Sequence, residues 1–146
     1  MSMGILIDKM KEDDLYSVLA IEDEVFAFPW CRESFIEEIK AGSEFYVAKE
    51  EGKIIGYLGF YKVDDEMQLV NLAITKSRQS KGIGSELLRW AMERAKGLGA
   101  KKATLEVEKE NLRAISFYHK FGFYEAGIRK GYYGLKEDAV IMWAEL

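Results

Sequence analysis

One segment in the middle of the chain constrains the fold most, because three different local patterns follow one another there. Residues 69–74 (Leu-Val-Asn-Leu-Ala-Ile) are typical of a strand, and residues 78–84 (Arg-Gln-Ser-Lys-Gly-Ile-Gly) form a basic loop with two glycines. The residues that follow predict a helix over 82–96 with an apolar stripe of Ile83, Leu87, Leu88, Ala91 and Ala95. A strand that runs through such a loop into a helix leaves unpaired backbone N–H groups at the positive end of the helix dipole. The segment therefore predicts an anion site, with a plain tight turn as the alternative.

The glycines of this loop favour a ligand that lies close to the main chain. Gly82 and Gly84 lack Cβ atoms, so a pyrophosphate can approach the backbone there, and Arg78 and Lys81 add positive charge. The loop differs from a Walker loop, which has Gly-Lys-Ser or Gly-Lys-Thr after its glycines. It also differs from the dinucleotide fingerprint, which has three glycines and a downstream acid. Neither of these two phosphate-binding motifs is predicted.

Hydrophobic periodicity predicts the other elements. Helices are expected over 13–25, 32–40 and 111–120, and strands over 45–49, 54–63, 67–74, 103–107, 123–128 and 139–143, with an opening strand at 5–9. Three successive strands with short connections predict an antiparallel meander. A length of 146 residues suits one domain, 1–146. The predicted fold class is α+β (mixed α/β), with a central sheet flanked by helices.

The charge balance and the cysteine content argue against several classes of protein. The 21 basic and 25 acidic side chains give a net charge of −4, which argues against general nucleic-acid binding. Cys31 is the only cysteine and His119 the only histidine, so neither a disulfide framework nor a zinc-type ligand cluster is expected. No apolar run approaches the roughly 20 residues of a membrane span. We expect a cytoplasmic protein, monomeric or weakly oligomeric, with no metal and no nucleic-acid or membrane partner.

Several motifs in the right order resemble one family. Gln79-x-x-Gly82-x-Gly84 is similar to the acyl-CoA-binding signature of the GNAT N-acetyltransferases, and the predicted element order matches their fold along the full chain. Further segments resemble the RimI type, the bacterial N-terminal alanine acetyltransferases of ribosomal proteins. They are Ala27-Phe28-Pro29-Trp30, Leu105-Glu106-Val107, Asn111, the run from Phe117 to Phe123, Arg129-Lys130-Gly131-Tyr132-Tyr133, and the run from Glu137 to Met142.

The resemblance implies a mostly antiparallel sheet that splays beside the glycine loop, with acetyl-CoA as the acetyl donor in the gap. Backbone groups of three strand residues would hold the pantetheine and the acetyl carbonyl, and these are Leu72, Ala73 and Ile74. Loop amides would hold the pyrophosphate, and they belong to Gln79, Ser80, Lys81, Gly82, Ile83 and Gly84. Asn111 would also contact CoA, although helix N-capping explains it equally well. For the strand, simple burial is the alternative.

The resemblance also implies two catalytic residues. Glu106 matches the general base, which would take a proton from the attacking amine directly or through a water. An α-amino group with a pKa near 8 is already about 10% neutral at pH 7, so the demand on the base is modest. Tyr118 matches the general acid that returns a proton to the CoA thiolate. The alternatives are a solvent-facing strand carboxylate for Glu106 and a core aromatic for Tyr118.

The remaining implied residues would bind the acceptor. Phe28 and Trp30 resemble one wall of a peptide site, and Tyr132 and Tyr133 resemble a covering loop between the last two strands. A staple between two helices is the alternative for Trp30, and a hairpin aromatic pair is the alternative for the tyrosines. The implied activity is acetyl transfer to a ribosomal protein's N-terminal alanine by direct attack, without an acyl-enzyme. The alternatives are a GNAT enzyme for another amine (a lysine side chain, a polyamine or a small molecule) and a non-catalytic acyl-CoA-binding module.

Overall fold

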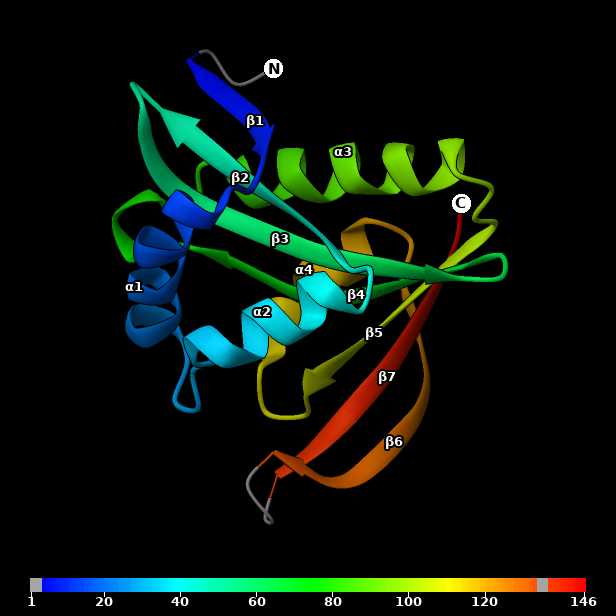
Figure 1. Ribbon diagram of the computed structural model, residues 1–146. Coiled ribbons are helices and arrows are strands. Elements are labelled where there is room, and N and C mark those ends of the chain that lie inside the picture. Colours follow the sequence, from blue (N-terminus) through cyan, green and yellow to red (C-terminus); the bar gives the residue numbers. More distant parts are fainter. Residues whose placement is uncertain (1–3, 134–136) are drawn as a thin grey trace. The chain divides into compact units, whose positions relative to one another are not determined.

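The strands and α-helices follow one another along the chain in the predicted order (Figure 1). The computed structural model describes residues 4–133 and 137–146. The strands of the described residues are β1 (Ile5–Lys9), β2 (Glu44–Glu50), β3 (Lys53–Val63), β4 (Glu66–Ile74), β5 (Lys102–Glu108), β6 (Tyr124–Tyr133) and β7 (Glu137–Glu145). The α-helices are α1 (Leu15–Val25), α2 (Arg32–Lys40), α3 (Ile83–Gly97) and α4 (Leu112–Lys120), with short 3-10 helices η1 (Glu12–Asp14) and η2 (Lys76–Arg78). Among the residues described, no helix is long and apolar enough to cross a bilayer.

Hydrogen bonding places the strands in the order β1-β2-β3-β4-β5-β7-β6. The pairs β1/β2, β2/β3, β5/β7 and β6/β7 are antiparallel, whereas β4 and β5 pair in parallel through residues 66–68 and 102–104. This order confirms the predicted α+β class and its mostly antiparallel sheet. The chain divides into two compact units, one formed by Met1–Tyr61 and Val70–Arg94 and the other by Lys62–Leu69 and Ala95–Leu146.

In the first unit, helices cover both faces of the strands (Figure 1). Phe45 and Val47 of β2 belong to a buried cluster with residues of α1 and α2. Tyr46, between them in sequence, packs its ring against that of Trp90 on α3 in a tilted arrangement, with the ring centroids 4.3 Å apart. Because successive strand side chains point to opposite faces, α1 and α2 cover one face and α3 covers the other. The core of this unit therefore has two layers.

The turn between β2 and β3 follows the local sequence. Glu51 and Gly52 have φ angles of 52° and 79°, and Glu50 pairs with Lys53 across the turn. Two central residues with positive φ form a type I′ turn, whose twist matches that of a hairpin. The predicted turn over 50–53 is confirmed.

Replacing Gly59 by alanine is expected to lower the free energy of unfolding by about 1–3 kcal/mol, because the core has no space for an added methyl group. A Cβ at Gly59 of β3 would lie 2.2 Å from Cε1 of Phe45. Chemical denaturation of the two proteins measures the difference. The matched control is Gly97→Ala on α3, where a Cβ meets nothing within 4 Å. Equal stability of Gly59→Ala and Gly97→Ala would contradict this packing.

In the second unit, burial alternates along β5 from Leu105 to Glu108. Ala103, Leu105 and Val107 are buried and share one face, which leaves Glu106 on the other face with Thr104. The antiparallel strands β7 and β6 follow β5 and run side by side, in red and orange in Figure 1. One prediction is wrong here, because β6 continues to Tyr133 rather than ending near residue 128. Tyr132 and Tyr133 therefore belong to a strand, since Tyr133 still pairs with Glu137 of β7.

Candidate functional site

The glycine loop ends at the first turn of α3, in the first unit. Ser80 and Gly82 have φ angles of 63° and 86°, and a Cβ at Gly82 would meet nothing within 4 Å. The Glu86 N–H donates to the Gly82 carbonyl at 3.1 Å, so Gly82 caps the helix. By helix geometry, the N–H groups of residues 83–85 have no intrahelical acceptor. An anion at this exposed turn would meet backbone donors and the positive end of a 15-residue helix.

The predicted loop residues differ in burial. Ser80, Lys81 and Gly82 are exposed, Gly84 is half-buried, and Ile83 is buried as the first residue of the helix's apolar stripe. The exposed residues are the ones that a ligand in solvent can approach, whereas the Ile83 side chain packs in the core. The loop thus combines an anchored helix with an accessible turn.

Two side chains of the loop form hydrogen bonds with other residues of the protein. Gln79 donates from Nε2 to the Ile74 carbonyl at 3.0 Å, which ties the loop to the end of β4. Arg78 donates from Nε to Oε1 of Glu50 at 2.6 Å, so its positive charge is locally balanced. These contacts give Gln79 and Arg78 roles in the shape of the loop.

A carboxylate from α1 holds the base of the loop. Glu24 accepts hydrogen bonds at Oε1 from the Thr75 hydroxyl at 2.6 Å and from the Lys76 N–H at 2.9 Å. These two bonds, with the nearby Lys76 charge, lower the pKa of Glu24. The carboxylate therefore accepts these bonds in its ionised form near neutral pH, and α1 is fixed to the start of η2.

The end of β4 is closely packed. Ala73 and Ile74 are buried, and a Cβ at Gly56 of β3 would lie 3.0 Å from the Ala73 carbonyl oxygen. The Leu72 N–H donates to its neighbour's side chain, Oδ1 of Asn71, at 3.1 Å. Of the backbone groups that the resemblance assigns to the donor, the Leu72 N–H therefore already has an acceptor within the protein.

Asn71 leads to a buried carboxylate that none of the sequence motifs includes. Glu22 of α1 is fully buried, and its Oε1 accepts the Trp30 backbone N–H at 2.8 Å. Its Oε2 accepts from Nδ2 of Asn71 at 2.7 Å and from the Tyr57 hydroxyl. Glu22 thereby joins the connection between α1 and α2 to both β3 and β4.

Burial controls the protonation of this carboxyl group. Loss of hydration raises the pKa of Glu22 to about 7, although the bonds from Trp30 and Asn71 oppose the shift. The nearby charge of Asp23 adds to the increase. Glu22 therefore exchanges its proton near neutral pH.

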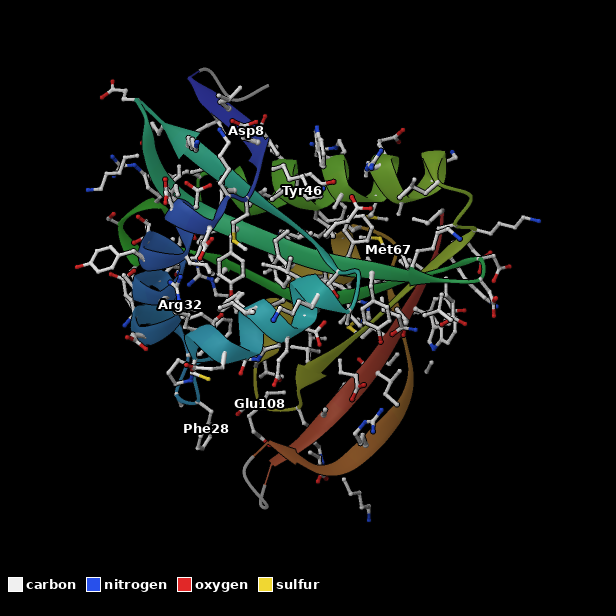
Figure 2. All side chains as sticks on the ribbon, viewed as in Figure 1. Asp8, Phe28, Arg32, Tyr46, Met67 and Glu108 are labelled. Carbon is white, nitrogen blue, oxygen red and sulfur yellow. The ribbon has the colours of Figure 1, made fainter. Side chains whose placement is uncertain are left out.

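The two predicted residues of the α1–α2 connection have different environments. Trp30 packs its ring 5.1 Å from that of Phe35 on α2, against the buried cluster of this unit. Phe28 is 68% exposed and points away from the ribbon in Figure 2. The staple interpretation thus accounts for Trp30, whereas Phe28 presents an aromatic ring to solvent.

In the second unit, Glu106 forms a forked ion pair. Its Oε1 and Oε2 accept from Nε and an Nη of Arg129 on β6, at 2.6 Å and 3.0 Å. The Glu106 side chain is 25% exposed, so the carboxylate is neither in the core nor fully in solvent. It can therefore still be reached by a small polar group.

Tyr118 lies in the aromatic core of α4. It is 8% exposed, and its ring contacts those of Phe117 at 5.2 Å and Phe123 at 5.7 Å. The core interpretation is thus confirmed for the ring, and it leaves a role for the hydroxyl open. Asn111 caps the same helix, since its Oδ1 accepts the Ala114 N–H at 3.1 Å. The side chains of Tyr132 and Tyr133 lie outside the described part of the structure.

Sequence reasoning missed Glu22, Asn71 and Arg129. Glu22 lies four and seven residues after Val18 and Leu15, which places an acid on the apolar stripe of α1. Asn71 interrupts an apolar strand in the same way. Both exceptions signal a buried polar contact. Arg129 lies in a segment that resembles the family, but its hydropathy pattern gives no signal of a polar contact, because an arginine on an exposed strand is ordinary. In the described part of the chain, no group of three His, Cys, Asp or Glu side chains is placed to hold a metal ion.

Comparison with known proteins gives consistent matches. The sequence model of the Acetyltransferase (GNAT) family matches residues 13–123. A protein of Bacillus subtilis strain 168, provisionally named [ribosomal protein bS18]-alanine N-acetyltransferase, is 35% identical over 143 residues, which cover 96% of this chain and 95% of that protein. The [ribosomal protein bS18]-alanine N-acetyltransferase of Escherichia coli K12 is 32% identical over 139 residues, 93% of this chain and 94% of that protein.

The three-dimensional structure agrees with these matches. The crystal structure of the ribosomal-protein-S18-alanine N-acetyltransferase from Escherichia coli superimposes with a TM-score of 0.89 at 30% sequence identity. The superposition covers 97% of this chain and 93% of that one. The similarity therefore extends through both compact units.

Proposed function

This chain belongs to the acetyltransferase (GNAT) family, and we propose that it acetylates the N-terminal alanine of a ribosomal protein. It is an acetyl-CoA-dependent N-acetyltransferase. The substrate proposal is carried by one observation, the 32–35% identity over almost the whole chain to enzymes named for bS18 alanine. Because ribosomal proteins are made in the cytoplasm, we assign the reaction to that compartment.

For the donor, we assign the pyrophosphate of acetyl-CoA to the exposed turn of the glycine loop. The backbone N–H groups at the start of α3 and the left-handed turn at Gly82 support this assignment. The pantetheine would follow the main chain at the end of β4, where Ala73 and Ile74 lie. Since the Leu72 N–H is bonded to Asn71, we assign to that residue only its carbonyl.

The chemistry requires two proton movements. The substrate's neutral α-amino group attacks the acetyl carbonyl carbon, and a C–N bond forms. Glu106 takes the proton that the nitrogen gives up, directly or through a water, and passes it to solvent. As the C–S bond breaks, Tyr118 gives its proton to the thiolate and regains one from solvent. The products are the acetylated N-terminus and CoA with a free thiol, and no acyl-enzyme forms.

Acceptor binding is assigned to the aromatic residues named above. The exposed Phe28 ring offers an apolar surface to a peptide, and Trp30 fixes the connection that carries it. Tyr132 and Tyr133 are proposed to cover the peptide's first residues with their hydroxyl groups.

An acetylation assay with matched peptides tests this function. Two peptides differ only at residue one, alanine or leucine, and a third has a blocked N-terminus and an internal lysine. Tandem mass spectrometry locates the acetyl group. We expect acetylation of the free N-terminus, with alanine preferred, and no reaction of the blocked peptide. Acetyl on the lysine alone would overturn the substrate, and CoA binding without transfer would overturn the activity.

A further inference from the structure

The Arg129–Glu106 pair crosses an intervening strand. Register places Gly127, Ile141 and Glu106 in one row across β6, β7 and β5, and Arg129, Ala139 and Glu108 in the next row. Residues in register, and those two apart along a strand, share a face. The Arg129 side chain thus reaches diagonally across β7 to Glu106 of the neighbouring row, although Glu108, labelled in Figure 2, lies in its own row.

The Arg129–Glu106 ion pair is not explained by a contribution to folding stability. The Arg129 side chain is 55% exposed and that of Glu106 is 25% exposed. Ion pairs with such exposure contribute little to the free energy of folding, because solvent screens them. What the fork does provide is orientation, because a planar guanidinium bonded to both oxygens fixes the plane of the carboxylate.

The fork also leaves the carboxylate able to react. Two carboxylate oxygens offer about four lone-pair positions, of which two parallel N–H···O bonds use two. Each oxygen of Glu106 can therefore accept one further hydrogen bond from an amine or a water while Arg129 stays in place. A freely rotating carboxylate would present those positions in many directions.

We propose that Arg129 is a positioning residue for acetyl transfer, whose forked contact holds the Glu106 carboxylate in the one orientation that accepts the substrate's proton. This inference rests on the proposed function, since it needs Glu106 as the base. Lysine keeps the charge but lacks the planar fork, so Arg129→Lys separates orientation from electrostatics.

We expect Arg129→Lys to lower kcat about 10-fold, since small misplacements of reacting groups are costly, while the KM values for peptide and acetyl-CoA stay within about twofold. Arg94→Lys is the matched control. Arg94 pairs with Glu44 at 3.2 Å, with 44% and 22% of the two side chains exposed, and we expect its kcat to be unchanged. An unchanged kcat in Arg129→Lys, or a raised peptide KM with an unchanged kcat, overturns the inference.

A double-mutant cycle tests whether Arg129 acts through Glu106. In the Glu106→Gln background, Arg129→Lys should lower kcat by less than about twofold, because the group that it positions is already lost. A full additional 10-fold loss would show an independent role and reject the proposal. The wild-type protein distinguishes failure of the proposed function from failure of the positioning role. If the wild type acetylates no free N-terminus, the proposed function itself is rejected. An active wild type with an unaffected Arg129→Lys rejects only the positioning role.

Discussion

Glu106→Gln and Tyr118→Phe are each expected to lower kcat by about 10²-fold or more, because each removes one of the two proposed proton transfers. Glutamine keeps the shape of the side chain and one acceptor for Arg129, but it cannot take a proton. Phenylalanine keeps the ring contacts with Phe117 and Phe123. Steady-state kinetics with an uncharged alanine peptide measures kcat for both variants. Calorimetry should show that each variant binds CoA with an affinity within about twofold of that of the wild type.

The chain offers a matched control for the first variant. Glu108→Gln makes the same change two residues along β5, on the same face of the strand, and should leave kcat close to that of the wild type. The ratio of wild-type kcat to Glu106→Gln kcat should also fall between pH 7 and pH 9, since the substrate's α-amine loses its proton without a base as the pH passes about 8. A defect of equal size in Glu106→Gln and Glu108→Gln would reject Glu106 as the base.

Glu22→Gln is expected to change how stability depends on pH. In the folded protein the pKa of Glu22 is about 7, raised from an ordinary 4.5 by burial. The folded state therefore holds this proton more tightly than the unfolded state does. The stability contribution is complete below pH 4.5 and is lost as the pH rises through 7. Between pH 5 and 8 the wild type should lose about 2–3 kcal/mol relative to Glu22→Gln.

Urea denaturation of both proteins at several pH values measures this difference. Glu24→Gln, two residues along the same helix, is the matched control. The pKa of Glu24 is lowered rather than raised, so this carboxyl group is ionised in both the folded and the unfolded state above pH 5. The difference in unfolding free energy between wild type and Glu24→Gln should therefore not change with pH there. A flat difference for Glu22→Gln as well would show that Glu22 does not hold its proton near neutral pH.

The local sequence predicted the elements and the loop well. Helix periodicity located α3 because Leu87, Leu88 and Ala91 recur on one face, and this face is buried. The turn at Glu51 and Gly52 follows from a glycine between two strand patterns, because glycine accepts a positive φ. Helix N-capping was the alternative to a CoA contact for Asn111, and the structure shows the cap. These features depend on neighbours within a few residues, which a linear pattern records. The β6 strand was predicted too short because the pattern of residues 129–133 lacks alternation, and pairing with β7 extends it.

The contacts around the proposed site depend on the fold. Glu22 meets Tyr57 and Asn71, which lie 35 and 49 positions away in sequence. Arg129 reaches Glu106 only because the registers of β6 with β7 and of β7 with β5 bring their rows together. A shift of one residue in either pairing would turn these side chains to opposite faces. Sequence patterns specify which residues prefer a strand or helix, whereas register and packing between distant segments decide which carboxylate is buried and which one is held by an arginine.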